Sequence, residues 1–224
     1  MKNLFLVITL ICSSVFVFGQ SPSKDDARRK RFEKTIEKLE NKANVLTPEN
    51  VHTVFVGSSS FTIWVGFEQD FDTEQVVNNG FGGSQLSDVI YYFDQLLTPF
   101  SPQQIVVYEG DNDISAGMTP EEYMDDVHTF LRMVEIKLPG THVSFLPPKP
   151  SPSRKHLLDS YNEVRKQLLE LSIEREKFDV IDITQVMYDL DGVIKKDIWK
   201  SDSLHMNRAG YELWAPIVQT YIRN

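Results

Sequence analysis

From residue 51 onward, short apolar runs alternate with longer stretches that carry apolar residues at helical spacing. The apolar runs are typical of strands and span 51–56, 75–78, 104–108, 142–146 and 178–182, while helical patterns span 60–67, 85–97, 120–138, 156–175 and 207–221. The start of the helix at 120–138 is well marked, because Thr119 and Glu122 form a capping box around Pro120. Strands that alternate with helices form a parallel sheet covered on both faces. We therefore predict an α/β fold, a three-layer α/β/α sandwich around a central, mostly parallel five-stranded sheet.

Sites in such folds lie at the carboxyl ends of the strands, so the loops that follow the strands are of most interest. The first strand stops at Gly57, and Ser58, Ser59 and Ser60 follow before a helical pattern begins. A strand, a tight turn and a helix in this order place a serine hydroxyl beside unpaired amides, where negative charge is stabilised. This suits a nucleophile that forms an oxyanion. Serine is also a preferred N-cap residue, so this stretch alone leaves a capping role equally open.

The second strand ends in a glycine-rich loop at 78–84, whose backbone can approach a ligand closely and bind an anion. A dinucleotide-binding loop does not fit, because Gln85 stands where the third glycine of that motif belongs. A plain glycine turn remains the alternative. The third strand is followed by Asn112, whose side-chain amide can donate to an oxyanion or stabilise a turn. Asp111 and Asp113 lack the further ligands of a calcium loop, so we predict no metal site.

Near the C-terminus, Asp202 precedes His205 by three residues, just before the last helical pattern. At this spacing both side chains can share one side of a turn, with the carboxylate orienting the imidazole. A serine nucleophile needs such a pair as its base. The proline-rich segment at 147–152 follows the fourth strand and has two interpretations, the rim of a pocket or a stiff connection.

These four segments, in this order, resemble the signature blocks of the SGNH (GDSL-type) esterase and lipase superfamily, over about residues 51–221. The resemblance implies the flavodoxin-like SGNH hydrolase fold and catalysis by a Ser-His-Asp triad without a cofactor. The residues it implies are Ser59, His205 and Asp202 for the triad, and Ser59, Gly83 and Asn112 for the oxyanion hole. One residue departs from the family pattern: Ser58 stands where the first block, Gly-Asp-Ser, has its aspartate. Whether Ser59 or a neighbouring serine attacks is therefore open.

The resemblance implies hydrolysis of a carboxylic ester with a short acyl or acetyl group, carried by a small molecule, a glycan or a lipid. The alternative is a catalytically silent binding module of the same fold that holds a glycan or an acylated ligand. A nucleotide-binding flavodoxin-like domain is a third interpretation, but it predicts a phosphate loop that the sequence lacks.

Residues 1–19 have the features of a secretory signal peptide: Lys2 precedes an apolar run at 4–18, and Gly19 ends a cleavage site of small-residue type. The run falls short of the roughly 18 or more apolar residues that span a bilayer. We expect export to the periplasm or the extracellular space. Cleavage would remove Cys12, the single cysteine, and leave a mature chain without disulfides or thiol chemistry.

The remaining chain divides into an N-terminal amphipathic helical segment at 20–50 and a single hydrolase domain at 51–224. In the first of these, Phe32, Ile36 and Leu39 share one helical face, and we assign it no chemistry. The formal net charge of −9, without a basic block, argues against nucleic acid and anionic membranes as partners. The sequence carries no signal for an oligomeric state.

Overall fold

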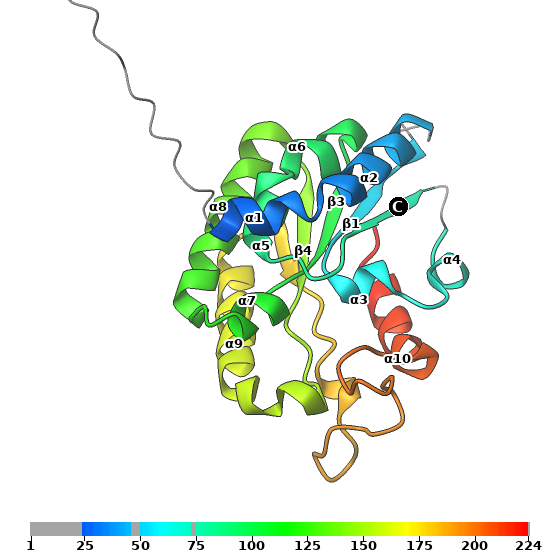
Figure 1. The fold of residues 1–224 in the computed structure, drawn as a ribbon, viewed down its shortest axis with the longest axis vertical. Helices are drawn as coiled ribbons and strands as arrows, with labels where there is room; N and C mark the ends of the chain where they lie inside the picture. Colours follow the sequence, from blue (N-terminus) through cyan, green and yellow to red (C-terminus); the bar gives the residue numbers. More distant parts are fainter. Residues whose placement is uncertain (1–23, 46–49, 73–74, 224) are drawn as a thin grey trace, which may run out of the picture.

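The computed structural model describes residues 24–45, 50–72 and 75–223, and the predicted signal peptide lies outside them. Five strands form one parallel sheet in the order β2-β1-β3-β4-β5 (Figure 1). The strands are β1 (Thr53–Gly57), β2 (Val76–Gly80), β3 (Gln104–Tyr108), β4 (His142–Leu146) and β5 (Phe178–Val180). The predicted fold class is confirmed, and the third and fourth strands have the predicted bounds.

Helices cover both faces of the sheet, as the three-layer prediction requires (Figure 1). One face packs against α2 (Glu33–Val45), α5 (Leu86–Tyr91), α6 (Phe93–Leu96), α8 (Pro120–Lys137) and α9 (Leu158–Glu174). The other packs against α3 (Ser59–Thr62), α4 (Phe67–Asp70), the 3-10 turn η4 (Gln185–Met187) and α10 (Arg208–Gln219). Successive side chains of β1 alternate between the two cores, with Val54 and Val56 in one and Phe55 in the other.

Two predicted helices are interrupted. The pattern at 60–67 forms α3 and α4, separated by a turn in which Gly66 has a φ of 85°. This turn lets Trp64 and Phe67 pack together around Phe55 in an aromatic cluster. The pattern at 85–97 likewise divides into α5 and α6, and the 3-10 turn η2 (Thr98–Phe100) follows. Between α3 and α4, the packing of aromatic side chains outweighs the preference of this segment for one continuous helix.

The predicted helix start at Thr119 is confirmed in detail. Thr119 Oγ1 accepts the backbone N–H of Glu122, and Glu122 Oε2 accepts that of Thr119. The helix predicted at 156–175 begins later, because the 3-10 turn η3 (Pro152–Leu157) precedes α9. Among the described residues, no helix combines the length and the hydropathy needed to cross a bilayer.

The N-terminal segment forms α1 (Lys24–Lys30) and α2, joined at Arg31 and Phe32. Phe32 and Ile36 are buried in the core, and the Phe32 ring packs edge-on against Phe81, with 5.1 Å between ring centroids. Phe81 belongs to the glycine-rich loop after β2, so the N-terminal helices rest on that loop.

Gly57, the last residue of β1, has no room for a side chain in the present backbone arrangement. Its φ is +146°, and a Cβ atom would lie 2.2 Å from the carbonyl oxygen of Tyr108, a backbone atom of the neighbouring strand. We expect Gly57→Ala to lower the free energy of unfolding by about 3–5 kcal/mol. The matched control is Gly117→Ala, where φ is +99° but no atom lies within 4 Å, so that only backbone strain of about 1–2 kcal/mol is added. Urea unfolding of both variants measures the difference, and equal losses would show that the contact with Tyr108 is unimportant.

Candidate active site

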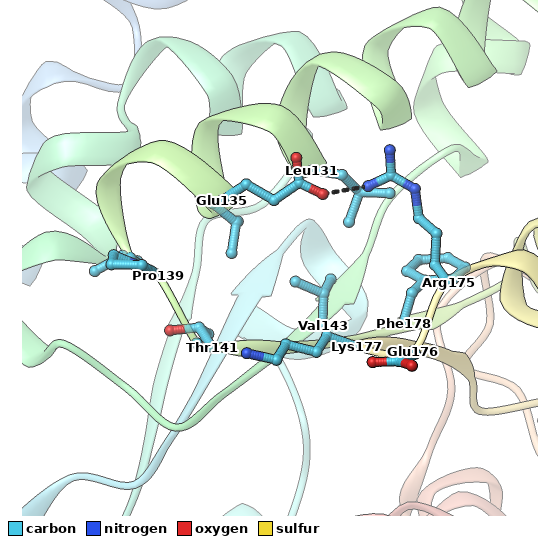
Figure 2. Close-up of a pocket in the computed structure, with 12 residues that line it drawn as sticks. Leu131, Glu135, Pro139, Thr141, Val143, Arg175, Glu176, Lys177 and Phe178 are labelled. Carbon is cyan, nitrogen blue, oxygen red and sulfur yellow. Dashed lines mark hydrogen bonds and ion pairs between the residues drawn. The ribbon is translucent and has the colours of Figure 1, made fainter.

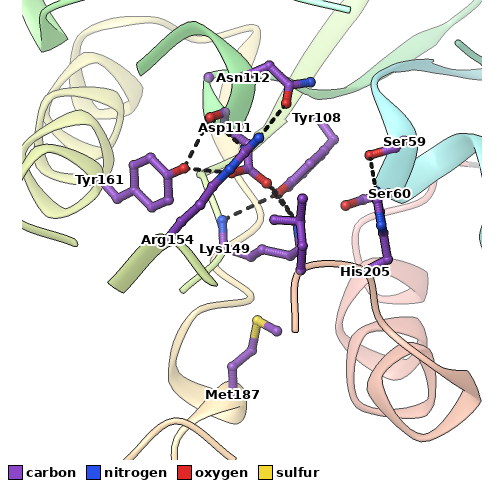
Figure 3. Close-up of polar contacts among 12 residues, drawn as sticks. Ser59, Ser60, Tyr108, Asp111, Asn112, Lys149, Arg154, Tyr161, Met187 and His205 are labelled. Atoms are coloured by element: carbon purple, nitrogen blue, oxygen red, sulfur yellow. Dashed lines mark hydrogen bonds and ion pairs between the residues drawn. The ribbon is translucent and has the colours of Figure 1, made fainter. Parts of the chain in front are cut away.

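His205 lies between the two other residues of the predicted triad. Its Nε2 atom is 3.0 Å from Ser59 Oγ, and its Nδ1 atom is 2.6 Å from Asp202 Oδ2. Figure 3 shows the imidazole directed at the serine hydroxyl. With a carboxylate at Nδ1, that nitrogen carries the proton, and Nε2 can accept the hydroxyl hydrogen of Ser59. The three side chains therefore have the arrangement of a nucleophile, a base and an orienting acid.

Asp202 is held as a carboxylate by the turn that also carries the histidine. The hydrogen bond from the His205 side chain, followed by that from the His205 backbone N–H, holds the pKa of Asp202 well below its usual range. Its Oδ1 atom accepts the backbone N–H groups of Leu204 and His205, at 3.0 and 2.9 Å. The backbone N–H of Lys200 donates to the carbonyl of His205 at 2.7 Å and closes the turn. Base and acid are thus positioned by one short segment.

Among the three consecutive serines, it is Ser59 that contacts His205. Ser58 and Ser60 are buried, whereas Ser59 is partly exposed. Ser58 is the N-cap residue of α3, and its carbonyl accepts the backbone N–H groups of Phe61 and Thr62. The carbonyl of Ser60 accepts the Tyr211 hydroxyl at 2.9 Å. The aspartate-to-serine change at position 58 therefore leaves the Ser59–His205 contact in place.

The glycine-rich loop after β2 passes directly beside the serine. A Cβ atom at Gly82 would lie 3.7 Å from Ser59 Cβ, in ordinary van der Waals contact, so the gap between the loop and the serine is about one methyl group wide. Gly83 follows with a φ of +82°, and its carbonyl accepts Arg31 NH2 at 2.7 Å. The N-terminal segment, to which the sequence assigned no chemistry, thus contacts a predicted oxyanion-hole residue.

Asn112 is tied to the same loop from the other side. It lies on α7 (Asp111–Ser115), directly after β3, and its Nδ2 atom donates to the carbonyl of Ser84 at 2.8 Å. The Gln85 side chain donates to the backbone carbonyl of Asn112 at 3.3 Å. The structure therefore brings all the predicted site residues to one edge of the sheet, with the triad in direct contact and Gly83 and Asn112 joined through Ser84.

Sequence reasoning missed a buried group of charged and hydroxyl side chains behind Asn112, which we call the Asp111 cluster. It consists of Tyr108, Asp111, Lys149, Arg154 and Tyr161 (Figure 3). Burial alone would raise the pKa of Asp111, but the charges of Lys149 and Arg154 outweigh burial and hold that pKa well below its usual range. The proline-rich segment at 147–152 supplies Lys149, so this segment is more than a stiff connection. Its single lysine, together with the nearby Arg154, was the signal available in the sequence.

A second buried carboxyl group lies beside the glycine-rich loop. Glu109 is fully buried, and its Oε1 atom is 2.5 Å from Ser84 Oγ. Within the described part of the chain, its Oε2 atom has no hydrogen-bond partner. Burial, followed by the charge of Asp113, raises the pKa of Glu109 well above its usual range. Burial also raises the pKa of Asp113 to about 7, although hydrogen bonds from backbone N–H groups to its carboxylate act to lower that pKa. The ionised form of Glu109 is therefore disfavoured in the folded protein relative to the unfolded chain.

A pocket of about 380 Å³ lies elsewhere, at the amino ends of β4 and β5 (Figure 2). Leu131, Val143 and Phe178 line this pocket, as do Glu135 and Arg175, which form an ion pair of 2.8 Å. None of the predicted site residues lines this pocket. In residues 24–45, 50–72 and 75–223, no group of three or more His, Cys, Asp or Glu side chains is arranged to hold a metal ion.

The raised pKa of Glu109 predicts a pH dependence of stability. Because its pKa is higher in the folded state than the ordinary value of 4.5, the folded protein binds more protons than the unfolded chain between these two values, and stability falls as pH rises through that window. Glu109→Gln removes the titrating group, so we expect the free energy of unfolding to fall less steeply between pH 5 and pH 8 than in the wild type. Urea unfolding across this range provides the measurement. Glu170→Gln, at an exposed position of α9, is the control, and an unchanged slope in Glu109→Gln would contradict the prediction.

Comparison with known proteins places the chain in a family. The model of the GDSL-like Lipase/Acylhydrolase family matches residues 53–213. No curated protein matches the chain.

Solved structures share the fold at low sequence identity. A Streptococcus pneumoniae protein described as a platelet activating factor has a TM-score of 0.73 and 20% identity, covering 87% of this chain and 96% of its own. An acylhydrolase from Bacteroides fragilis has a TM-score of 0.71 and 18% identity, covering 89% and 97%. The acetyl xylan esterase AlAXEase has a TM-score of 0.62 and 15% identity, covering 77% and 100%. With the family model matched over most of its length, the chain belongs to the GDSL-like lipase/acylhydrolase family, within the SGNH hydrolases, and is a hydrolase of ester bonds.

Proposed function

We propose that this chain is an exported serine esterase that cleaves a carboxylic ester with a short acyl or acetyl group. One observation carries the proposal: His205 Nε2 lies 3.0 Å from Ser59 Oγ while Asp202 holds the opposite side of the imidazole. A hydroxyl becomes a nucleophile when a base of this kind accepts its proton. The predicted signal peptide supports export.

Two half-reactions follow from this geometry. In the first, His205 takes the proton of Ser59 as the serine oxygen attacks the ester carbonyl, and then gives that proton to the departing alcohol. In the second, His205 takes a proton from water, which attacks the acyl-enzyme, and then returns that proton to the Ser59 oxygen as the bond to the acyl group breaks and the carboxylic acid leaves. Asp202 stays ionised throughout and stabilises the imidazolium that forms in each half-reaction.

The oxyanion of each tetrahedral intermediate requires hydrogen-bond donors beside Ser59. We assign this role to the backbone amides of Ser59 and Gly83 and to the side-chain amide of Asn112. The close approach of Gly82 to Ser59, and the hydrogen bond between Asn112 and Ser84, support the assignment. Donors fixed in advance stabilise developing charge without reorganising during the reaction.

An ester on a glycan is the substrate that we favour, with an acetyl group as the acyl part. The likeness of fold to an acetyl xylan esterase and the predicted export to a compartment that holds glycans both support this choice. A lipid ester is the competing substrate within the same chemistry.

The proposal is tested with p-nitrophenyl acetate and the wild-type protein alongside Ser59→Ala and His205→Ala. We expect hydrolysis by the wild type and its loss, by several orders of magnitude, in both variants, because each removes one member of the triad. Ser60→Ala is the control and should retain activity, since Ser60 accepts the Tyr211 hydroxyl with its backbone carbonyl, which the substitution keeps. A fluorophosphonate probe should label Ser59. Absence of both hydrolysis and labelling would favour the silent binding module instead.

Removal of one oxyanion donor gives a second prediction. Asn112→Ala should lower kcat by about 10²- to 10³-fold, because the lost hydrogen bond acts on charge that develops in the transition state. KM should change little, since the ester ground state carries little charge at that oxygen. Steady-state kinetics on p-nitrophenyl acetate measures both parameters, and full activity in Asn112→Ala would remove Asn112 from the hole.

A further inference from the structure

The Asp111 cluster adjoins the proposed oxyanion hole, because Asp111 precedes Asn112 in α7 and a second cluster residue contacts the Asn112 side chain. Arg154 Nη2 donates to Asn112 Oδ1 at 2.9 Å (Figure 3). Neither the triad nor the chemistry proposed above uses this arginine. Through this contact, Arg154 can influence the orientation of the Asn112 side-chain amide.

The oxygen of the Asn112 amide accepts hydrogen bonds, whereas its nitrogen donates them. Its Oδ1 atom accepts from Arg154, and its Nδ2 atom donates to the carbonyl of Ser84. A rotation of the amide by 180° would set the NH2 group against the guanidinium, donor against donor, and the oxygen against the Ser84 carbonyl, acceptor against acceptor. The observed orientation is therefore fixed from both ends.

This orientation leaves one N–H for the reaction. An asparagine side chain has two N–H donors on Nδ2, and Ser84 takes one of them. The described residues supply no second acceptor for Nδ2. A substrate carbonyl oxygen at Ser59 can therefore accept the other. The guanidinium of Arg154, which donates to Oδ1, also polarises the amide and makes its N–H groups stronger donors to an oxyanion.

The arginine is itself held by the rest of the cluster. Arg154 NH1 donates to the backbone carbonyl of Asp111 at 2.8 Å and also contacts the Asp111 carboxylate closely. That carboxylate accepts in addition from Lys149 at 2.6 Å, from Tyr108 at 2.7 Å and from Tyr161 at 2.7 Å. Lys149 is 1% exposed and the Arg154 side chain 15%, so both side chains are largely shielded from solvent. One arm of the guanidinium is anchored on Asp111, and the other reaches Asn112.

We propose that Arg154 is a positioning residue of the oxyanion hole, which holds and polarises the Asn112 amide so that its second N–H faces the ester oxygen. The proposal rests on the oxyanion role proposed for Asn112. It goes further in assigning a function to a residue outside the triad and the hole.

The kinetic test is a double-mutant cycle on p-nitrophenyl acetate hydrolysis. Arg154→Ala should lower kcat by about 10- to 100-fold and leave KM within about twofold of the wild type, because the hydrogen bond that it orients matters only in the transition state. In the Asn112→Ala background, Arg154→Ala should cause no further loss, since the group it positions is gone. Losses that multiply would overturn the proposal, as would wild-type kcat in a folded Arg154→Ala protein.

Arg154→Lys separates positioning from stability. Lysine keeps a positive charge near Asp111, but it lacks the planar fork that reaches Asp111 and Asn112 together. We expect a melting temperature closer to the wild type than that of Arg154→Ala, yet a similar loss of kcat. Activity that instead followed stability across the two variants would indicate a merely structural role. Lys155→Ala, at an exposed neighbouring position, is the control and should match the wild type.

A second measurement does not depend on hydrolysis. In ¹⁵N-labelled protein, the side-chain NH2 signals of Asn112 are identified by their loss in Asn112→Ala. In Arg154→Ala they should shift and exchange faster with solvent, while Lys155→Ala leaves them unchanged. Unchanged signals in Arg154→Ala would overturn the proposal. If the wild type hydrolysed no ester, the proposed function would fail, and these signals would still decide whether Arg154 holds Asn112.

Discussion

The in-register pairing of three parallel strands sets the level at which the active-site loops begin. Gly57 pairs with Gly80 on one side and with Tyr108 on the other, so β1, β2 and β3 end together. The serine turn, the glycine-rich loop and the helix that bears Asn112 therefore leave the sheet side by side. The missing side chain at Gly57 permits this arrangement, because the carbonyl oxygen of Tyr108 occupies the place that a Cβ would need.

The fold was readable from the sequence because parallel strands buried on both faces are continuous apolar runs. The runs at 104–108 and 142–146 match β3 and β4, whereas β1 and β2 end later than predicted, at Gly57 and Gly80, because the apolar pattern stops before these residues although their backbones still pair. The interruption between α3 and α4 was not readable. Periodicity reports which side chains are apolar, but the turn at Gly66 is set by contacts between Trp64, Phe67 and the strand beneath them.

The active site likewise has one part that the sequence predicted and one part that it did not. Each predicted site residue belongs to a short local motif, and the sheet brings these motifs together, so the motifs could be recognised one at a time. The Asp111 cluster has no such motif, since Asp111 meets Lys149 and Tyr161 across 38 and 50 positions of the chain. A lysine among prolines has the pattern of a solvated loop. Buried charges are costly unless they are paired, and the pairing here depends on tertiary contacts that no local pattern encodes.

The turn at 200–205 carries both the histidine and its carboxylate, and its own hydrogen bonds close it. Any displacement of this turn moves the two side chains as one body and leaves their mutual geometry intact. Of the contacts within the triad, the one that the tertiary structure must maintain is that between Ser59 and His205, which are 146 positions apart. When the surrounding loops move, the triad therefore stays intact as long as the distance between Ser59 Oγ and His205 Nε2 is kept.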